Sequence, residues 1–180
     1  MPYIQPLDRA AATGATAATL DAIQKKLGAL PNLFRTLARS PAALQAYVQL
    51  AAAAGGGRFD AARRERIALT VGEANDCGYC VAAHGALGTM AGLDDAQIEA
   101  ARVARANDAR ETAVLSLAQR IVANRGHVDT AALDAFKSAG FDDADVLEVL
   151  VNVVLNVFTN YTNHLARTEI DFPVRAKLAA

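Results

Sequence analysis

The chain has 180 residues, of which 53% are hydrophobic, 21% charged and 6% aromatic, and it carries a formal net charge of -1. This length corresponds to one domain with a real core, and the composition excludes disordered and collagen-like chains. With no tryptophan and few aromatic residues, packed helices are favoured over a β-sandwich. The nearly balanced charge argues against nucleic acid and anionic membranes as partners.

The N-terminal segment has no basic flank followed by an apolar run, so we expect no secretory signal and a cytoplasmic protein. The longest apolar stretch, 146–158, is interrupted by Glu148, Asn152 and Asn156, and it is shorter than the ~20 residues that span a membrane. We therefore expect no membrane-spanning helix.

Helix signals in chain order predict an all-α fold, a single domain over 1–180 with about eight helices and no sheet. Within 1–57, Pro31 and Pro41 stand where proline is tolerated, in the first turn of a helix. Three consecutive glycines at 55–57 then separate this N-terminal helical region from a central segment. We interpret the break as a loop inside one domain.

The central segment, 58–92, is predicted to be a helical hairpin. Asp60 is placed to cap a helix that runs to about Ala74. The Asn-Asp pair at 75–76 provides two good N-cap residues, which predicts that the second helix starts near Cys77.

The C-terminal segment, 93–180, contains three helix-start signals, in each of which an acidic N-cap residue is followed three positions later by a second polar residue. These pairs are Asp94 with Gln97, Asp108 with Glu111, and Asp142 with Asp145. Between the last two pairs, a short helix from about Thr130 is expected to end at Gly140.

The last long helix is predicted over 142–167, where neither glycine nor proline interrupts the chain. Its polar residues recur every four positions, and because four residues drift by only ~40° on a helix, they form one slowly winding stripe. The stripe consists of Glu148, Asn152, Asn156, Asn160 and His164. It either forms a buried amide ladder across helices, the interpretation we favour, or lines a substrate cavity. The apolar remainder of this helix predicts a homo-oligomer.

The residues whose side chains are best suited to catalysis lie close together in the central segment. The chain has only two cysteines, Cys77 and Cys80, and His84 follows the second by four residues. In the first turn of a helix the two sulfurs are within reach of each other, backbone N–H groups favour a thiolate, and His84 shares the face of Cys80. An antiparallel hairpin brings Glu65 to a similar depth, where its carboxylate can orient the imidazole. This pattern predicts a carboxylate–histidine–thiol relay.

The segment 65–84 resembles the core of the carboxymuconolactone decarboxylase-like superfamily, in its alkylhydroperoxidase AhpD branch. The signature of that family is a Glu, eleven residues, and then Cys-two-Cys-three-His. The matched positions are Glu65, Cys77, Cys80 and His84. The segments 27–41 and 163–173 also look like features of its peroxidase-related members.

The resemblance implies an AhpD-like helical bundle that assembles as trimers or hexamers. It also implies a thiol-dependent alkyl hydroperoxide reductase, in which Cys80 becomes a sulfenic acid, Cys77 resolves it to a disulfide, His84 acts as base and Glu65 orients His84. The expected partners are a small organic peroxide or hydrogen peroxide and an unidentified thiol or dithiol reductant, and we expect neither cofactor nor metal. Well-studied AhpD enzymes carry a histidine directly before the second cysteine, whereas this chain has Tyr79, so their proton relay between the two sulfurs does not carry over unchanged.

Three other interpretations fit part of the pattern. A zinc site would use Cys77, Cys80 and His84, but a structural site needs a fourth protein ligand, and His127 looks like an exposed loop residue. A lactone decarboxylase is the second, although decarboxylase members of the superfamily generally lack the cysteine pair. The third is a non-enzymatic helical oligomer whose cysteines are small core residues. Glu73 competes with Glu65 as the acidic partner, and we interpret it as a solvated helix-end charge.

Overall fold

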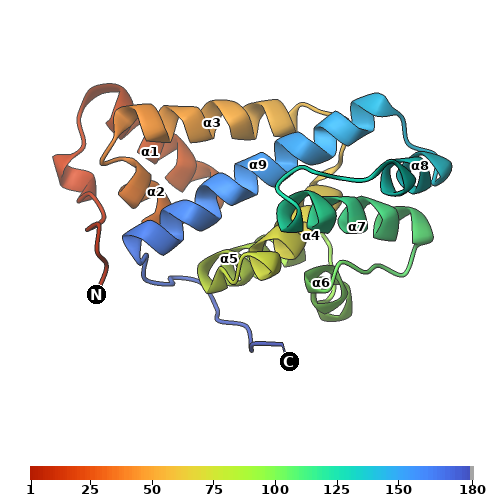
Figure 1. Cartoon of the computed structure of the whole chain (residues 1–180). Helices are drawn as coiled ribbons and strands as arrows, with labels where there is room; N and C mark the ends of the chain where they lie inside the picture. Colours follow the sequence, from red (N-terminus) through yellow and green to blue (C-terminus); the bar gives the residue numbers. More distant parts are fainter. Residues whose placement is uncertain (179–180) are drawn as a thin grey trace.

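The computed structural model describes residues 1–178 and is all-helical over that range, with no strand (Figure 1). A short 3₁₀ turn, Arg9–Ala11, precedes nine α-helices, one more than the approximate number expected. The helices are α1 Gly14–Leu27, α2 Asn32–Leu37, α3 Pro41–Gly55, α4 Ala61–Ala74, α5 Gly78–Met90, α6 Asp95–Arg102, α7 Ala109–Ala123, α8 Thr130–Ser138 and α9 Asp143–Ala166. The predicted fold class is confirmed, and positions 179–180 of the expected C-terminal segment lie outside the described residues.

Most predicted helix starts coincide with observed caps, because the side chains named for them bond to free backbone N–H groups. Asp60 accepts from the backbone N–H of Arg63, and the predicted capping boxes at the starts of α6 and α9 form with both of their hydrogen bonds. The start of α7 differs. Asp108 caps it through Arg110, while the side chain of Glu111 turns away to bind Arg63 on α4. A long-range ion pair thus replaces the predicted local bond.

The helix α9 runs through the middle of the molecule and packs against α2, α3, α4, α5 and α7 (Figure 1). By length and composition it meets the criteria for a membrane span, as core helices of water-soluble proteins also do. Its contacts on several sides and its buried asparagines are those of a core helix.

The buried apolar residues form two hydrophobic cores. The larger core joins α4 to α6, α7, α8 and α9. The second core joins the N-terminal helices to α5, and both cysteines belong to it. The start of α5 is therefore packed between the N-terminal helices and the rest of the bundle.

Residues 167–178, which we call the C-terminal strap, leave α9 and lie along α5. The carboxylate of Asp171 accepts hydrogen bonds from the backbone N–H of Asn32 at 2.7 Å and from the hydroxyl of Tyr79 at 2.8 Å. Further along, the buried guanidinium of Arg102 donates to the backbone carbonyl of Ala176 at 2.9 Å. The strap thereby ties α2, α5 and α6 together.

Candidate active site

The turn between α4 and α5 determines where the two cysteines lie. Asp76 adopts the left-handed conformation, with φ of 50°, and the backbone N–H of Cys77 bonds to the carbonyl of Gly72 at 2.8 Å. The N-cap of α5 is Cys77 itself and not the preceding Asn-Asp pair, because Asn75 ends α4 and Asp76 closes the turn. This corrects the predicted cap and places Cys80 at the third position of the helix.

The two cysteine side chains are free thiols in direct contact, as their spacing predicted. The Sγ of Cys77 donates a hydrogen bond to the Sγ of Cys80 at 2.8 Å, and both residues are buried. The hairpin helices pack closely here, since a Cβ added at Gly72 of α4 would lie at van der Waals distance, 3.4 Å, from the Cβ of Cys80.

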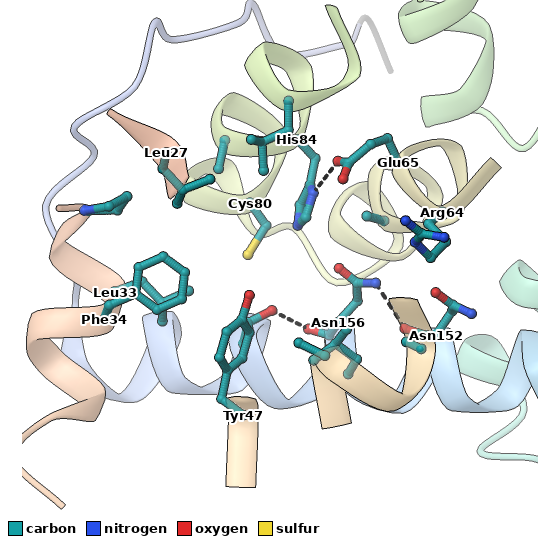
Figure 2. Close-up of a pocket in the computed structure, with 18 of the residues that line it drawn as sticks. Leu27, Leu33, Phe34, Tyr47, Arg64, Glu65, Cys80, His84, Asn152 and Asn156 are labelled. Carbon is teal, nitrogen blue, oxygen red and sulfur yellow. Dashed lines mark hydrogen bonds and ion pairs between the residues drawn. The ribbon is translucent and has the colours of Figure 1, made fainter. Parts of the chain in front are cut away.

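The predicted carboxylate–imidazole contact is also present. The Nδ1 of His84 lies 2.7 Å from Oε2 of Glu65, and the side chains are 21% and 20% exposed. Figure 2 shows the ring between Glu65 and Cys80, with the sulfur of Cys80 directed into the same open space. One hydrogen-bonded pair thus fixes the ring beside the thiol.

The pKa values of the two thiols are shifted in opposite directions. The hydrogen bond from Cys77, opposed by burial and assisted by the charge of His84, lowers the pKa of Cys80 to about 6. The same hydrogen bond, together with burial, raises the pKa of Cys77. Burial by itself lowers the pKa of His84, but the charge and hydrogen bond of Glu65 outweigh it and raise the pKa above its ordinary value. These opposite shifts favour the thiolate form at Cys80 and retention of the proton at Cys77.

A cavity of about 340 Å³ opens in front of Cys80 (Figure 2). Its apolar wall includes Leu27, Leu33, Phe34, Leu155 and Phe172, and its polar residues include Arg64, Glu65, His84, Asn152 and Asn156. Cys80 lines this cavity, whereas Cys77 is not among the lining residues. A ligand in the cavity would meet one sulfur and not the other.

The structure brings together all four predicted site residues, Glu65, Cys77, Cys80 and His84. The rival acid Glu73 instead binds the buried Arg102, with 2.8 Å between Oε2 and Nε. Within residues 1–178, no group of three or more histidine, cysteine or acidic side chains is arranged to hold a metal ion.

Tyr79 lines the cavity, but its hydroxyl bonds to groups other than the two cysteines. It donates to Asp171 and accepts from the backbone N–H of Leu33 at 3.2 Å, and its ring stands edge-on to Phe172. Burial, with the charge of Asp171 added, raises the pKa of Tyr79. Its role in this structure is packing and anchoring of the strap.

For the polar stripe of α9, the favoured amide ladder across helices is found at Asn160, which bonds to Asn75, but it is wrong at Asn152 and Asn156, where the alternative, a cavity lining, holds. Asn152 and Asn156 line the cavity, and their amides bond to carbonyls of their own helix one turn earlier, not to other helices. His164 is exposed, whereas its neighbour Asn163 is a buried polar residue in the last turns of the helix. The reason is the ~40° drift of a four-residue step, which carries the stripe out of the core after Asn160.

Two site residues were missed by the sequence reasoning. Asn163 donates from Nδ2 to the Sγ of Cys80 at 3.3 Å, and a three-residue step from Asn160 would have pointed to it. Tyr47 lines the cavity from α3, and burial followed by the negative charges of Glu65 and Cys80 raises its pKa to about 12. Nothing in the alanine-rich sequence around Tyr47 marks it.

Residues 41–120 match the sequence pattern of the carboxymuconolactone decarboxylase family. Together with the fold, this match confirms the predicted resemblance to AhpD-like proteins of the carboxymuconolactone decarboxylase superfamily. No curated protein was found to match the chain.

Solved structures with the same fold cover nearly the whole chain. One is the alkylhydroperoxidase AhpD core of an uncharacterized peroxidase-related protein from Ralstonia eutropha JMP134, with TM-score 0.86, 24% identity and coverage of 94% of this chain and 92% of that one. A peroxidase-related protein from Silicibacter sp. TM1040 has TM-score 0.80, 24% identity and coverage of 93% and 92%. The debrominase Bmp8 in complex with 2,3,4-tribromopyrrole has TM-score 0.81, 19% identity and coverage of 94% and 91%.

Proposed function

We propose that this protein is a thiol-dependent hydroperoxide reductase acting on small organic hydroperoxides, with Cys80 as the attacking thiolate. The observation that carries the proposal is the pair of contacting thiols of which only Cys80 faces the cavity, beside an imidazole held by a carboxylate. A low thiol pKa is what a peroxide-reducing cysteine requires, because the thiolate is the nucleophile.

In the first step, the Cys80 thiolate attacks the terminal oxygen of R–O–O–H and the O–O bond breaks. The leaving alkoxide takes a proton and departs as an alcohol, and Cys80 becomes a sulfenic acid. The raised pKa of His84 favours the protonated ring beside the thiolate. His84, expected as the base that takes the proton of the Cys80 thiol, is therefore also placed to supply that proton to the alkoxide. Glu65 holds the ring and its charge in place.

In the second step, Cys77 attacks the sulfur of the Cys80 sulfenic acid. The S–O bond breaks, hydroxide leaves with the proton of Cys77 as water, and a disulfide joins the two residues. An external thiol or dithiol then returns both cysteines to thiols. One peroxide is thus reduced by two electrons, and the substrate yields an alcohol and water.

A second candidate reaction follows from the likeness to a debrominase and from the aromatic residues in the cavity wall. A dithiol can replace bromine on an aromatic ring by hydrogen, giving bromide, a proton and a disulfide. Release of bromide from 2,3,4-tribromopyrrole therefore belongs in the assay beside peroxide consumption, as does loss of a lactone carboxylate for the decarboxylase alternative.

A homo-oligomer, trimeric or hexameric as the resemblance implies, also remains a proposal. It is supported by exposed apolar side chains on α9, namely Leu147, Leu150, Val154, Tyr161 and Leu165. Light scattering at micromolar concentration tests it, and a monomeric mass would contradict it.

The test of the proposed function is titration of the reduced protein with tert-butyl hydroperoxide while free thiols are counted. We expect two thiols lost per peroxide in the wild type, unaffected by a chelator. In Cys77→Ser, dimedone should trap a sulfenic acid on Cys80. Labelling of Cys77 in Cys80→Ser, with Cys80 never labelled, would reverse the two roles. Peroxide left untouched by the wild type would refute the function.

A further inference from the structure

Two asparagines of α9 lie beside the cysteine pair, and the proposed reaction steps do not use them. Asn160 and Asn163 are 0% and 4% exposed. The Nδ2 of Asn163 donates to the Sγ of Cys80 at 3.3 Å, which lies within hydrogen-bond range for sulfur. The long helix therefore contributes a neutral donor to the atom that reacts.

The amide of Asn160 is oriented by the turn that precedes the cysteines. Its Oδ1 accepts from the Nδ2 of Asn75 at 2.8 Å, and Asn75 is the last residue before Asp76 and Cys77. Among the described residues, the Nδ2 of Asn160 and the Oδ1 of Asn163 have no hydrogen-bond partner although both atoms are buried. A buried polar atom without a partner destabilises the fold, so two such atoms beside the cysteine pair call for a functional explanation.

Other polar groups near the sulfurs are already engaged. The hydroxyl of Tyr79, which occupies the position of the family histidine, is bonded to Asp171 and to the backbone of Leu33. The Nδ1 of His84 is bonded to Glu65. The titratable groups that act electrostatically on Cys80 or feel its charge are Cys77, His84, Tyr47 and Tyr79.

We propose that Asn163 is a catalytic residue, whose amide holds the anionic sulfur of Cys80, and that Asn160, fixed by Asn75, is its companion in a two-amide anion site. The proposal rests on the proposed function only in that Cys80 is the reacting thiolate. Both amides also act to lower the pKa of Cys80. They provide uncharged hydrogen-bond donors beside the sulfur of Cys80.

The test replaces Asn163 by leucine, which has a similar size and no donor. A hydrogen bond to a charged group is worth about 1.5–3 kcal/mol, so the fraction of Cys80 thiolate below neutral pH should fall about tenfold to a hundredfold. The measurements are thiolate absorbance against pH and the rate of alkylation of Cys80 by iodoacetamide, located by mass spectrometry. Thr162→Val is the matched control, because the Thr162 hydroxyl bonds only to the carbonyl of Phe158 and does not line the cavity.

Thermal unfolding separates this role from a structural one. Removal of an unpartnered buried oxygen should leave the midpoint of Asn163→Leu at or above that of the wild type. A lower midpoint with an unchanged Cys80 pKa would overturn the proposal. Should the leucine variant fail to fold, Asn163→Asp keeps the shape and places a carboxylate at the sulfur. An unchanged Cys80 pKa in that variant would overturn the proposal equally.

None of these measurements uses a peroxide, so the two proposals fail separately. A raised Cys80 pKa in Asn163→Leu, in a protein that reduces no peroxide, would support the amide site and refute the reductase. If the wild type reduces peroxide but the Asn163→Leu variant keeps the Cys80 pKa unchanged, the reductase is supported and the amide site is refuted.

Discussion

Replacing Glu65 by glutamine removes one negative charge from the site and leaves its shape nearly unchanged. Glutamine can still accept a hydrogen bond from His84, so the ring keeps its orientation while its charge loses support. The pKa of His84 should then fall, because burial lowers it and Glu65 is the main influence that raises it. With a neutral ring beside it, the pKa of Cys80 should rise.

The geometry indicates the size of this effect. The two atoms are 2.7 Å apart and both side chains are about four-fifths buried, so the contact is a charge-assisted hydrogen bond sheltered from solvent. Such bonds contribute about 1.5–3 kcal/mol, or roughly a tenfold to hundredfold change in an equilibrium. Loss of proton transfer by His84 adds to this, since acid–base assistance is worth roughly 10²–10⁴. We expect Glu65→Gln near the lower end of that range and His84→Ala near the upper end.

The assay is tert-butyl hydroperoxide consumption with excess dithiothreitol, measured against pH and accompanied by circular dichroism. Glu73→Gln is the matched control, since Glu73 lies on the same helix but pairs with Arg102. Its rate should equal that of the wild type at temperatures where it is folded. If Glu65→Gln consumed peroxide at the wild-type rate, or if Glu73→Gln slowed it as much, the relay through His84 would be refuted.

Two further predictions concern pH and the strap. The pKa of Cys80 is lowered to about 6, so peroxide consumption should fall tenfold per pH unit below that pH, where the thiolate is lost. Consumption should fall again at higher pH, where His84 loses the proton that it supplies to the leaving alkoxide. A profile that keeps rising up to the ordinary cysteine pKa of about 8.5 would contradict this. Tyr79→Phe removes the hydroxyl that bonds to Asp171 and Leu33, so the free energy of unfolding in urea should fall by about 1–2 kcal/mol. Unchanged stability in that variant, with strongly reduced peroxide consumption, would mean that the hydroxyl acts on substrate.

The sequence was sufficient for the helices because their signals are local. Capping residues such as Asp60 and Asp94 bond to backbone atoms two or three positions away, and no tertiary contact has to be known. The prediction was wrong where a distant residue competed for the same side chain, as Arg63 does for Glu111. It was also wrong at the start of α5, because the left-handed Asp76 closes a tight turn in place of capping.

The site residues likewise fall into those that local sequence spacing predicts and those that depend on distant helices. Glu65, Cys77, Cys80 and His84 come from one hairpin, so spacing along two adjacent helices was enough to bring them together. The cavity wall and the amides come from α3 and α9, whose positions depend on packing of the whole bundle. A four-residue spacing does not show where along the helix the polar residues leave the core. For this reason the prediction included His164 and missed the buried Asn163.

The last prediction separates the two contributions of Cys77. Its thiol donates to Cys80 at 2.8 Å, and this hydrogen bond is the largest influence that lowers the pKa of Cys80. Serine at position 77 keeps a donor of nearly the same size, whereas alanine keeps none, and neither can form the disulfide. Both variants should therefore stop after one turnover with Cys80 as a sulfenic acid.

The variants should differ in how fast they reach that point. The donor to a charged sulfur is worth about 1.5–3 kcal/mol, so Cys77→Ala should have a Cys80 pKa about one to two units above that of Cys77→Ser. Single-turnover mixing with peroxide near pH 6, with dimedone trapping as the readout, should show the alanine variant slower by about tenfold or more. Equal rates and equal Cys80 pKa values in the two variants would mean that Cys77 only resolves the sulfenic acid, and that His84 and the α9 amides alone hold Cys80 as a thiolate.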